Sequence, residues 1–130
     1  MKSAYQKYKN TSVQSASREK LLLMMYEAAI RFSKQAVSAI DAKNIADRGL
    51  YIGRAYDIVL ELNNTLDHQV GGDIAANLEQ LYMFITEQLT QANVTGERKY
   101  LENAIRVLEI LHQGWMEAVA KLKKEDSLDR

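Results

Sequence analysis

The chain has 130 residues, of which 47% are hydrophobic and 26% are charged, and its 17 basic residues balance its 17 acidic ones. This length suits one domain that buries about two-thirds of its unfolded surface, and the lack of cysteine excludes disulfides, thiolate zinc sites and cysteine nucleophiles. The balanced charge gives no indication of nucleic-acid binding, and no long apolar run or hydrophobic signal core is present, so we expect a cytoplasmic protein that does not insert into membranes.

Residues 1–16 show no sustained hydrophobic period and are predicted to form an irregular, polar arm that carries Tyr5 and Tyr8. The arm contains several lysines, whereas no Lys or Arg occurs between Arg54 and Arg98. Two interpretations of this asymmetry stay open. The charged surfaces are simply solvated, or the basic arm lies on, or competes for, an acidic middle surface.

Two amphipathic helices are predicted in the first half of the chain. The first covers about Arg18 to Asp41, with Ser17 as its N-cap, and the second covers about Ile45 to Leu66. Their core-facing positions follow the i, i+3, i+4 spacing of a helix. In chain order these positions are Leu21, Leu22, Met25, Ala28, Ala29, Phe32, Ala36, Ile40, Ile52, Ala55, Val59, Leu62 and Leu66.

The Gly71-Gly72 pair separates the second helix from a third, and Asp73 is placed to cap that third helix. The third helix covers about Asp73 to Ala92, and a fourth covers about Glu97 to Leu122. Their predicted core positions are Ile74, Leu78, Leu81, Ile85, Leu89, Leu101, Ala104, Ile105, Leu108, Leu111, Trp115 and Leu122.

Short connections between the four helices predict an all-α fold, an antiparallel up-down four-helix bundle with an irregular N-terminal arm. The expected organisation is an arm at residues 1–16, a bundle at residues 17–122 and a flexible C-terminal tail at residues 123–130. Successive helices are then neighbours in space, because each connection is too short to cross the bundle.

Every predicted helix carries apolar side chains beyond a single core stripe. At about 100° per residue, these positions lie opposite the core stripe or beside it. Either a thick core absorbs them, or they form a surface that the arm, a second copy of the chain or a partner peptide covers. The positions are Leu23, Tyr26, Ile30, Val37, Tyr51, Ile58, Leu60, Met83, Phe84, Tyr100, Val107 and Ile110.

The two histidines, His68 and His112, give weak indications of chemistry. Glu109 and His112 match the Glu-x-x-His element of di-iron bundles, but a second such pair is absent and the predicted core positions hold no carboxylate. A phosphotransfer histidine is expected to have a basic neighbour one turn later, where this chain has Trp115 and Met116. We therefore expect neither an enzyme nor a bound metal or cofactor, and the lack of a basic recognition helix argues against nucleic-acid binding.

The segment from Leu66 to Phe84, LDHQVGGDIAANLEQLYMF, resembles the Leu-Asp-x-x-x-Gly-Gly-x-Ile-Ala-x-Asn-Leu-x-x-Leu-Tyr signature of the FliS-type flagellar export chaperones. Matches to that family's pattern occur in order from Ala4-Tyr5 to Trp115. Between them lie Ala16-Ser17-Arg18-Glu19-Lys20-Leu21, Met25-Tyr26-Glu27, Arg54-Ala55-Tyr56-Asp57-Ile58, Gln91-Ala92-Asn93 and Leu111. Departures include Arg18, where the family usually has proline, and Phe84, where tyrosine is usual, and they put details of partner contact in doubt.

The resemblance implies a cytoplasmic chaperone that binds the disordered C-terminal segment of flagellin, prevents premature polymerisation and keeps flagellin competent for flagellar type III export. It further implies contact with the flagellar export gate and a free form that is a monomer or weak dimer. The alternatives are a helical-bundle homodimer with a structural or adaptor role and, with less support, a His phosphotransfer domain. The candidate client-binding residues are Tyr5, Tyr8, Leu23, Tyr26, Ile30, Tyr51, Ile58, Tyr82, Phe84, Tyr100, Val107 and Ile110. For Tyr82, a place in the core is the simpler interpretation.

Overall fold

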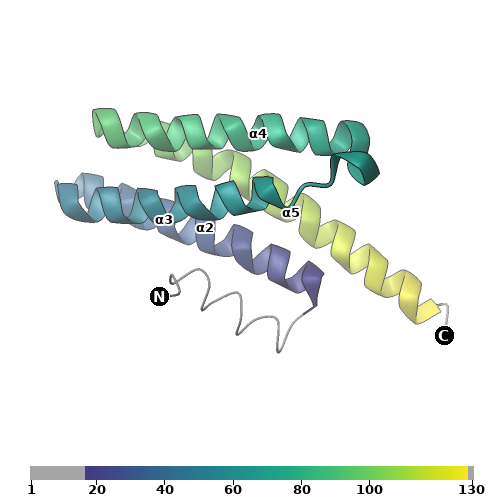
Figure 1. Ribbon diagram of the computed structural model, residues 1–130. Coiled ribbons are helices and arrows are strands. Elements are labelled where there is room, and N and C mark those ends of the chain that lie inside the picture. The colour runs from purple at the N-terminus through teal and green to yellow at the C-terminus, as the bar shows by residue number, and fades with distance from the viewer. Residues whose placement is uncertain (1–16, 129–130) are drawn as a thin grey trace, which may run out of the picture.

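The computed structural model describes residues 17–128, and the side chains of residues 17–125. Four α-helices make up nearly all of this range: α2 (Arg18–Asp41), α3 (Ile45–Asn64), α4 (His68–Thr95) and α5 (Arg98–Leu128). Each helix packs against the one before it and α5 returns against α2, which makes an antiparallel up-down ring (Figure 1). The predicted all-α four-helix bundle is confirmed, whereas the predicted arm lies outside the described residues.

Capping residues determine where the first helices begin. Ser17 Oγ accepts a hydrogen bond from Lys20 N at 3.2 Å at the start of α2, as predicted, and Asn44 Oδ1 accepts one from Asp47 N at 3.0 Å at the start of α3. At the same end of the bundle as Asn44, Gly96 takes the left-handed conformation with φ 72° and ends α4. These local signals place the short connections that keep neighbouring helices antiparallel.

The connection into α4 differs from the predicted loop around the glycine pair. Asp67, and not Asp73, is the N-cap, because Asp67 Oδ1 accepts hydrogen bonds from Gln69 N at 3.0 Å and from Val70 N at 3.1 Å. One helical turn therefore precedes Gly72, whose backbone takes φ 50° and ψ −123° and kinks α4. The prediction of Asp73 as the cap is wrong, since the Asp67 carboxylate folds the residues before the glycine pair into a turn of their own.

α5 continues past the predicted helix end at Leu122 and reaches Leu128. Residues 121–128 contain mostly good helix formers, and Lys121 and Glu125 have opposite charges at i, i+4 spacing. The last turns of α5 thus need less help from tertiary packing. As a result, the C-terminal end of α5 projects beyond the rest of the bundle in Figure 1.

The core runs along the inside of the ring and confirms most of the predicted core positions. Three predictions are wrong, since Ile74 is 69% exposed, Leu81 is 37% exposed and Leu122 is 54% exposed. Ile74 lies near the N-terminal end of α4 and Leu122 near the C-terminal end of α5, where a helix has fewer neighbours than in the middle of the bundle. The remaining predicted positions are at least partly buried. Those that are fully buried are Met25, Ala28, Ala29, Ala36, Ile52, Ala55, Val59, Leu62, Ile85, Leu89, Leu101, Ala104 and Leu108.

The ion pairs of Lys and Arg that the structure describes lie at the surface. Arg98 donates to Asp41 at 2.9 Å and to Glu102 at 2.8 Å, and it joins the start of α5 to the end of α2. Exposed pairs of this kind contribute about 0–1 kcal/mol each, so the stability of the bundle depends on its core. Within residues 17–128, no helix has both the length and the apolar composition needed to cross a lipid bilayer.

Candidate functional site

The predicted client-binding residues fall into three groups in the structure. Tyr5 and Tyr8 lie outside the described residues. Tyr26 and Ile58 are 0% and 5% exposed, so the prediction that they lie outside the core is wrong, whereas Tyr82 is 2% exposed and is a core residue, as its simpler interpretation predicts. The third group is partly buried or exposed, and its role in binding stays a prediction. This group is Leu23, Ile30, Tyr51, Phe84, Tyr100, Val107 and Ile110.

Tyr26 and Tyr82 are buried because their hydroxyl groups have partners inside the bundle. The two hydroxyls share a hydrogen bond, and Trp115 Nε1 donates another to Tyr26 Oη at 3.2 Å. Burial raises the pKa of both tyrosines above their ordinary value of 10.0, and the Tyr26 hydroxyl adds to the rise at Tyr82. These three residues join α2, α4 and α5, and they belong to the core.

A hydrogen bond marks the outer side of the α4–α5 pair, where Asn103 Nδ2 donates to Gln88 Oε1 at 3.0 Å. At about 100° per residue, several apolar residues share the flank of α4 that contains Gln88 or the flank of α5 that contains Asn103. We define these two flanks together as the α4–α5 face. Its residues are Ile74, Asn77, Leu81, Phe84 and Gln88 on α4, and Asn103, Val107, Ile110 and Gly114 on α5.

The α4–α5 face carries no charge, and its apolar residues are exposed apart from Val107, which is partly buried. Ile74 is 69% exposed and Ile110 is 66% exposed, and no residue of the face is ionisable. The antiparallel register brings Phe84 level with Val107 and Leu81 level with Ile110. Single exposed apolar residues are normal on a protein surface, whereas a contiguous group of them is typical of a binding site.

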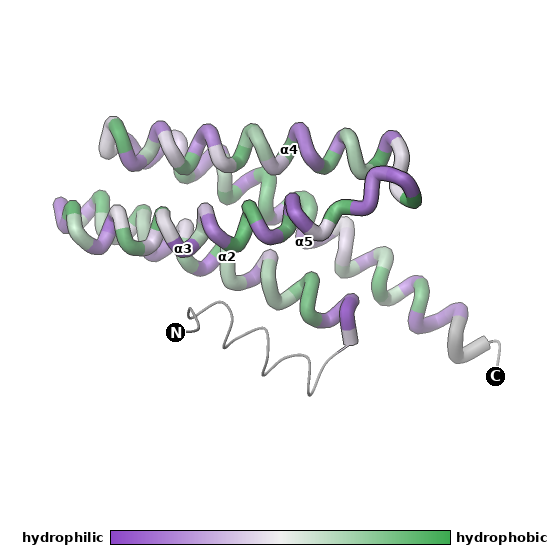
Figure 2. The backbone as a smooth tube through the Cα atoms, in the orientation of Figure 1, coloured by the Kyte–Doolittle hydropathy of each residue, from purple (hydrophilic) through white to green (hydrophobic). Residues whose placement is uncertain are grey.

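Sequence reasoning placed Phe84, Val107 and Ile110 outside the core but put Ile74 and Leu81 inside it. Ile74, Leu81 and Phe84 follow i, i+7, i+10 spacing, which is a helical stripe separate from the buried one. Apolar residues recur along the whole of α4 and much of α5 in Figure 2, beyond the positions of a single stripe. The spacing could have identified the second stripe, but it does not say which stripe is buried.

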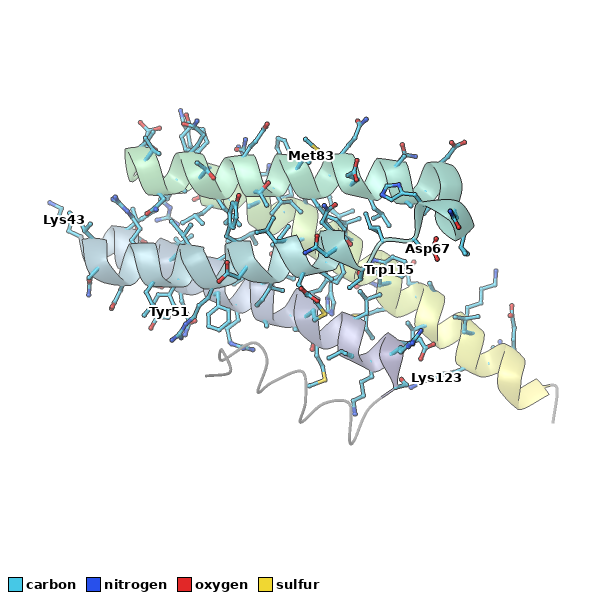
Figure 3. All side chains as sticks on the ribbon, viewed as in Figure 1. Lys43, Tyr51, Asp67, Met83, Trp115 and Lys123 are labelled. Atoms are coloured by element: carbon cyan, nitrogen blue, oxygen red, sulfur yellow. The ribbon has the colours of Figure 1, made fainter. Side chains whose placement is uncertain are left out.

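Aromatic and basic side chains meet on the opposite side of the ring, between α2 and α3. The rings of Phe32 and Tyr51 stack with their centroids 6.4 Å apart and an interplanar angle of 18°. The guanidinium carbons of Arg31 and Arg54 lie 5.2 Å and 5.5 Å from the centroid of the Phe32 ring. Tyr51, labelled in Figure 3, is a predicted site residue, whereas the other three are not. We refer to these four residues as the arginine–aromatic cluster.

A shallow groove of about 480 Å³ lies between α2 and α5, and the predicted site residue Ile30 lines it. On its rim, His112 Nε2 is 3.5 Å from Glu27 Oε1, and Lys34 Nζ is 3.9 Å from Glu109 Oε1. The His112 side chain is only 18% exposed, which does not suit a histidine that must receive a phosphoryl group from another protein. Among the residues that the structure describes, no group of three or more His, Asp or Glu side chains could hold a metal ion.

Comparison with known proteins finds one family that this chain matches. The model of the family described as FliS, flagellar protein FliS, matches residues 1–122. The chain is similar to the flagellar secretion chaperone FliS of Vibrio cholerae, with 36% identity over 119 residues that cover 88% of each chain. It is also similar to the protein of the same name from Campylobacter jejuni, with 33% identity over 114 residues that cover 88% of this chain and 89% of that one. A solved structure described as a flagellar chaperone from bacteria shares the fold, with a TM-score of 0.75 at 23% identity over 91% of this chain and 96% of that chain.

Proposed function

The chain belongs to the FliS family of flagellar secretion chaperones, and we propose on this premise that its client is the C-terminal segment of flagellin. The client segment is disordered before it binds and folds onto the bundle. Binding hides the segment from other flagellin molecules, which prevents premature polymerisation and keeps flagellin competent for type III export. The observation that carries this proposal is the α4–α5 face.

The chemistry of the α4–α5 face suits a peptide that folds as it binds. An amphipathic helix of the client can lay its apolar side against the face, and the anchors of such a helix recur every three to four residues. No charged group of the face loses its water shell in the complex, which avoids a large desolvation cost. The exposed side-chain amide of Asn77 can bond to polar groups of the client, whereas the amides of Gln88 and Asn103 are bonded to each other. Segments that fold on binding typically bury about 1,000–3,000 Å².

The proposal extends to the cellular role of the protein. The chaperone acts in the cytoplasm, where flagellin is made, and it delivers its client to the flagellar export gate. It has no catalytic activity of its own, and release of the client at the gate requires no nucleotide hydrolysis by this chain. The free form is a monomer or a weak dimer, which leaves the α4–α5 face open for the client.

Isothermal titration calorimetry with a peptide of about the last forty residues of the same organism's flagellin tests the proposal. We expect a 1:1 complex with a negative heat-capacity change, because apolar surface is removed from water. Circular dichroism should show more helix in the mixture than in the sum of the separate components. A folded chaperone that produces no heat with the peptide at micromolar concentrations would exclude flagellin as the client.

The position of the binding surface is tested with three serine variants. Phe84→Ser and Ile110→Ser remove apolar side chains from the α4–α5 face, and each should weaken peptide binding by about tenfold or more. Met83→Ser is the matched control, because Met83 is on the same helix and 55% exposed but lies outside the face (Figure 3). Equal affinities for all three variants would place the client elsewhere on the bundle.

A structural or adaptor homodimer is the alternative, in which a second copy of the chain covers the α4–α5 face. The same exposed apolar residues favour it, since a self-complementary apolar patch is typical of a two-fold interface. Analytical ultracentrifugation distinguishes the two functions. A tight, salt-insensitive dimer that the flagellin peptide does not dissociate supports the homodimer, and a monomer that forms a 1:1 complex supports the chaperone.

A further inference from the structure

The arginine–aromatic cluster between α2 and α3 contains two guanidinium groups that share one aromatic ring. Arg31 precedes Phe32 on α2, and Arg54 reaches the same ring from α3. Tyr51 stacks on Phe32 and limits the positions that this ring can take. Four residues from two helices therefore hold two positive charges in a restricted place on the surface.

The contact with the ring leaves the hydrogen-bond donors of both arginines available. A guanidinium group interacts with an aromatic ring through charge and its flat face, whereas its five N–H donors point outward in its own plane. Neither Arg31 nor Arg54 forms an ion pair or a hydrogen bond with any residue whose side chain the structure describes. Arg98, in contrast, donates to two carboxylates, and Arg48 donates to the Asn93 carbonyl at 3.0 Å.

Carboxylates close to the cluster in sequence do not neutralise it. Glu27, one turn before Arg31, lies 3.5 Å from His112 instead. Asp57, one turn after Arg54, forms no ion pair with it within the described part of the chain. The two exposed guanidinium groups thus have the charge and the free donors to bind an anion from outside the bundle, next to the partly buried rings of Phe32 and Tyr51.

We propose that the arginine–aromatic cluster is a carboxylate-binding site for the client, a proposal that rests on the proposed function. The guanidinium fork matches the two oxygens of a carboxylate, and the adjoining rings can contact an apolar side chain of the same peptide. The carboxylate comes either from an Asp or Glu side chain of the client or from the C-terminus of the client. The recognition of a peptide's charged group here complements the uncharged contacts at the α4–α5 face.

The order of the helices in the ring gives this site a role in positioning the client. The α2–α3 side lies opposite the α4–α5 side, so a client that occupies both must pass around the bundle. An extended chain spans about 3.3 Å per residue, so a segment of several tens of residues is long enough for that path. The carboxylate site would then determine the direction in which the client runs and the register in which its apolar anchors meet the α4–α5 face.

The test compares the full-length chaperone with the double variant Arg31→Gln/Arg54→Gln in calorimetric titrations. The ligands are the C-terminal flagellin peptide with a free C-terminus and the same peptide with an amidated C-terminus. The matched control is Lys121→Gln/Lys124→Gln, which removes the same charge from the exposed end of α5. Circular dichroism melting confirms that both variants are folded. If the glutamine variant does not fold, Arg31→Lys/Arg54→Lys keeps the charge but removes the fork and takes its place.

We expect the arginine variant to bind the free-carboxylate peptide at least about tenfold more weakly than wild type, and with a smaller salt dependence, because charge-assisted hydrogen bonds are lost. The lysine control should change affinity by less than about twofold. If the α-carboxylate is the group bound, amidation of the peptide weakens its binding to wild type by the same factor as the arginine substitutions do. Amidation then has no effect on binding to the arginine variant. If amidation has no effect while the arginine variant still binds weakly, an acidic side chain of the client is the group bound.

Two kinds of result would overturn the proposal. In the first, the arginine variant binds both peptides as tightly as wild type does, or loses no more affinity than the lysine control does. The carboxylate site is then wrong, and flagellin remains the client. If wild type binds neither peptide, the proposed function itself is wrong, and the carboxylate site is wrong with it.

Discussion

Tyr26, Tyr82 and Trp115 are the residues whose polar atoms most constrain the core. Trp115 Nε1 donates to Tyr26 Oη at 3.2 Å, and the Tyr26 and Tyr82 hydroxyls share a hydrogen bond across 56 residues of sequence. A buried hydroxyl that loses its partner costs about 1–3 kcal/mol, and Tyr26 is the residue that joins the other two, because Tyr82 and Trp115 each bond to its hydroxyl. This network links side chains of α2, α4 and α5 inside the bundle.

The buried tyrosines make stability sensitive to high pH. Burial raises the pKa of Tyr26 and Tyr82 above the ordinary value of 10.0, so the unfolded chain releases these protons at lower pH than the folded chain does. Their contribution is therefore fully present below about pH 10 and is lost as the pH rises beyond it. Chemical denaturation between pH 8 and pH 11 should show a smaller loss of the free energy of unfolding in Tyr82→Phe than in wild type. Tyr56 lies outside the group formed by Tyr26, Tyr82 and Trp115, so Tyr56→Phe should lose as much of its free energy of unfolding as wild type does. An identical loss in all three proteins would contradict the prediction.

Ile58 and Ile110 test the boundary between core and surface. Ile58 is 5% exposed and Ile110 is 66% exposed, although both were predicted to lie outside the core. Ile58→Ala should lower the free energy of unfolding by about 2–5 kcal/mol, because it removes buried methyl groups and leaves a cavity. Ile110→Ala should change it by less than about 0.5 kcal/mol. Urea denaturation measures both values, and equal losses would mean that Ile110 is also part of the core.

At the scale of elements, α4 combines two functions that compete for its surface. One stripe, which includes Ile85 and Leu89, faces the core, and a neighbouring stripe, which includes Ile74 and Leu81, faces outward on the α4–α5 face. The kink at Gly72 separates the first turn from the rest of the helix. α4 is thus a core element and, in the proposed function, also the main element of the binding surface.

Periodicity was sufficient to predict the four helices and most of the core, because an amphipathic helix repeats every 3.6 residues wherever it lies. It was not sufficient for the candidate site. Tyr26, which the helical spacing placed outside the core, is buried where its hydroxyl meets Tyr82 and Trp115, and Ile74, which was placed in the core, is exposed near the N-terminal end of α4. Partners far apart in sequence decide both outcomes, and a single helix does not contain that information.

The cap of α4 is predicted to depend on Asp67 and not on Asp73. Asp67→Ala removes the acceptor for the backbone N–H groups of Gln69 and Val70 and should lower the free energy of unfolding by about 0.5–2 kcal/mol. Asp73→Ala should cost less, because the Asp73 side chain is not the acceptor for these groups. Thermal denaturation of both variants measures the difference. An equal or larger loss for Asp73→Ala would show that the helix effectively begins after the glycine pair.

At the scale of the whole molecule, the ring of four helices presents two unlike surfaces on opposite sides. The α4–α5 face is apolar and uncharged, whereas the arginine–aromatic cluster between α2 and α3 is positively charged. The segment between Arg54 and Arg98, which includes all of α4, carries acidic residues and no Lys or Arg. A client that follows this surface meets different chemistry along its path, which favours one direction of binding over the reverse.

The N-terminal arm, residues 1–16, is predicted to compete with the client for this surface. Tyr5 and Tyr8 are apolar points on a basic segment, and the acidic middle of the chain attracts such a segment. A tethered arm acts at a high effective concentration even if each contact is weak, and it lowers the fraction of chaperone that is open to the client. Deletion of residues 1–15 should therefore raise the association rate of the flagellin peptide in stopped-flow measurements, and Tyr5→Ser/Tyr8→Ser in the full-length chain should raise it in the same direction. Equal association rates for truncated and full-length chaperone at both low and moderate salt would mean that the arm leaves the surface open.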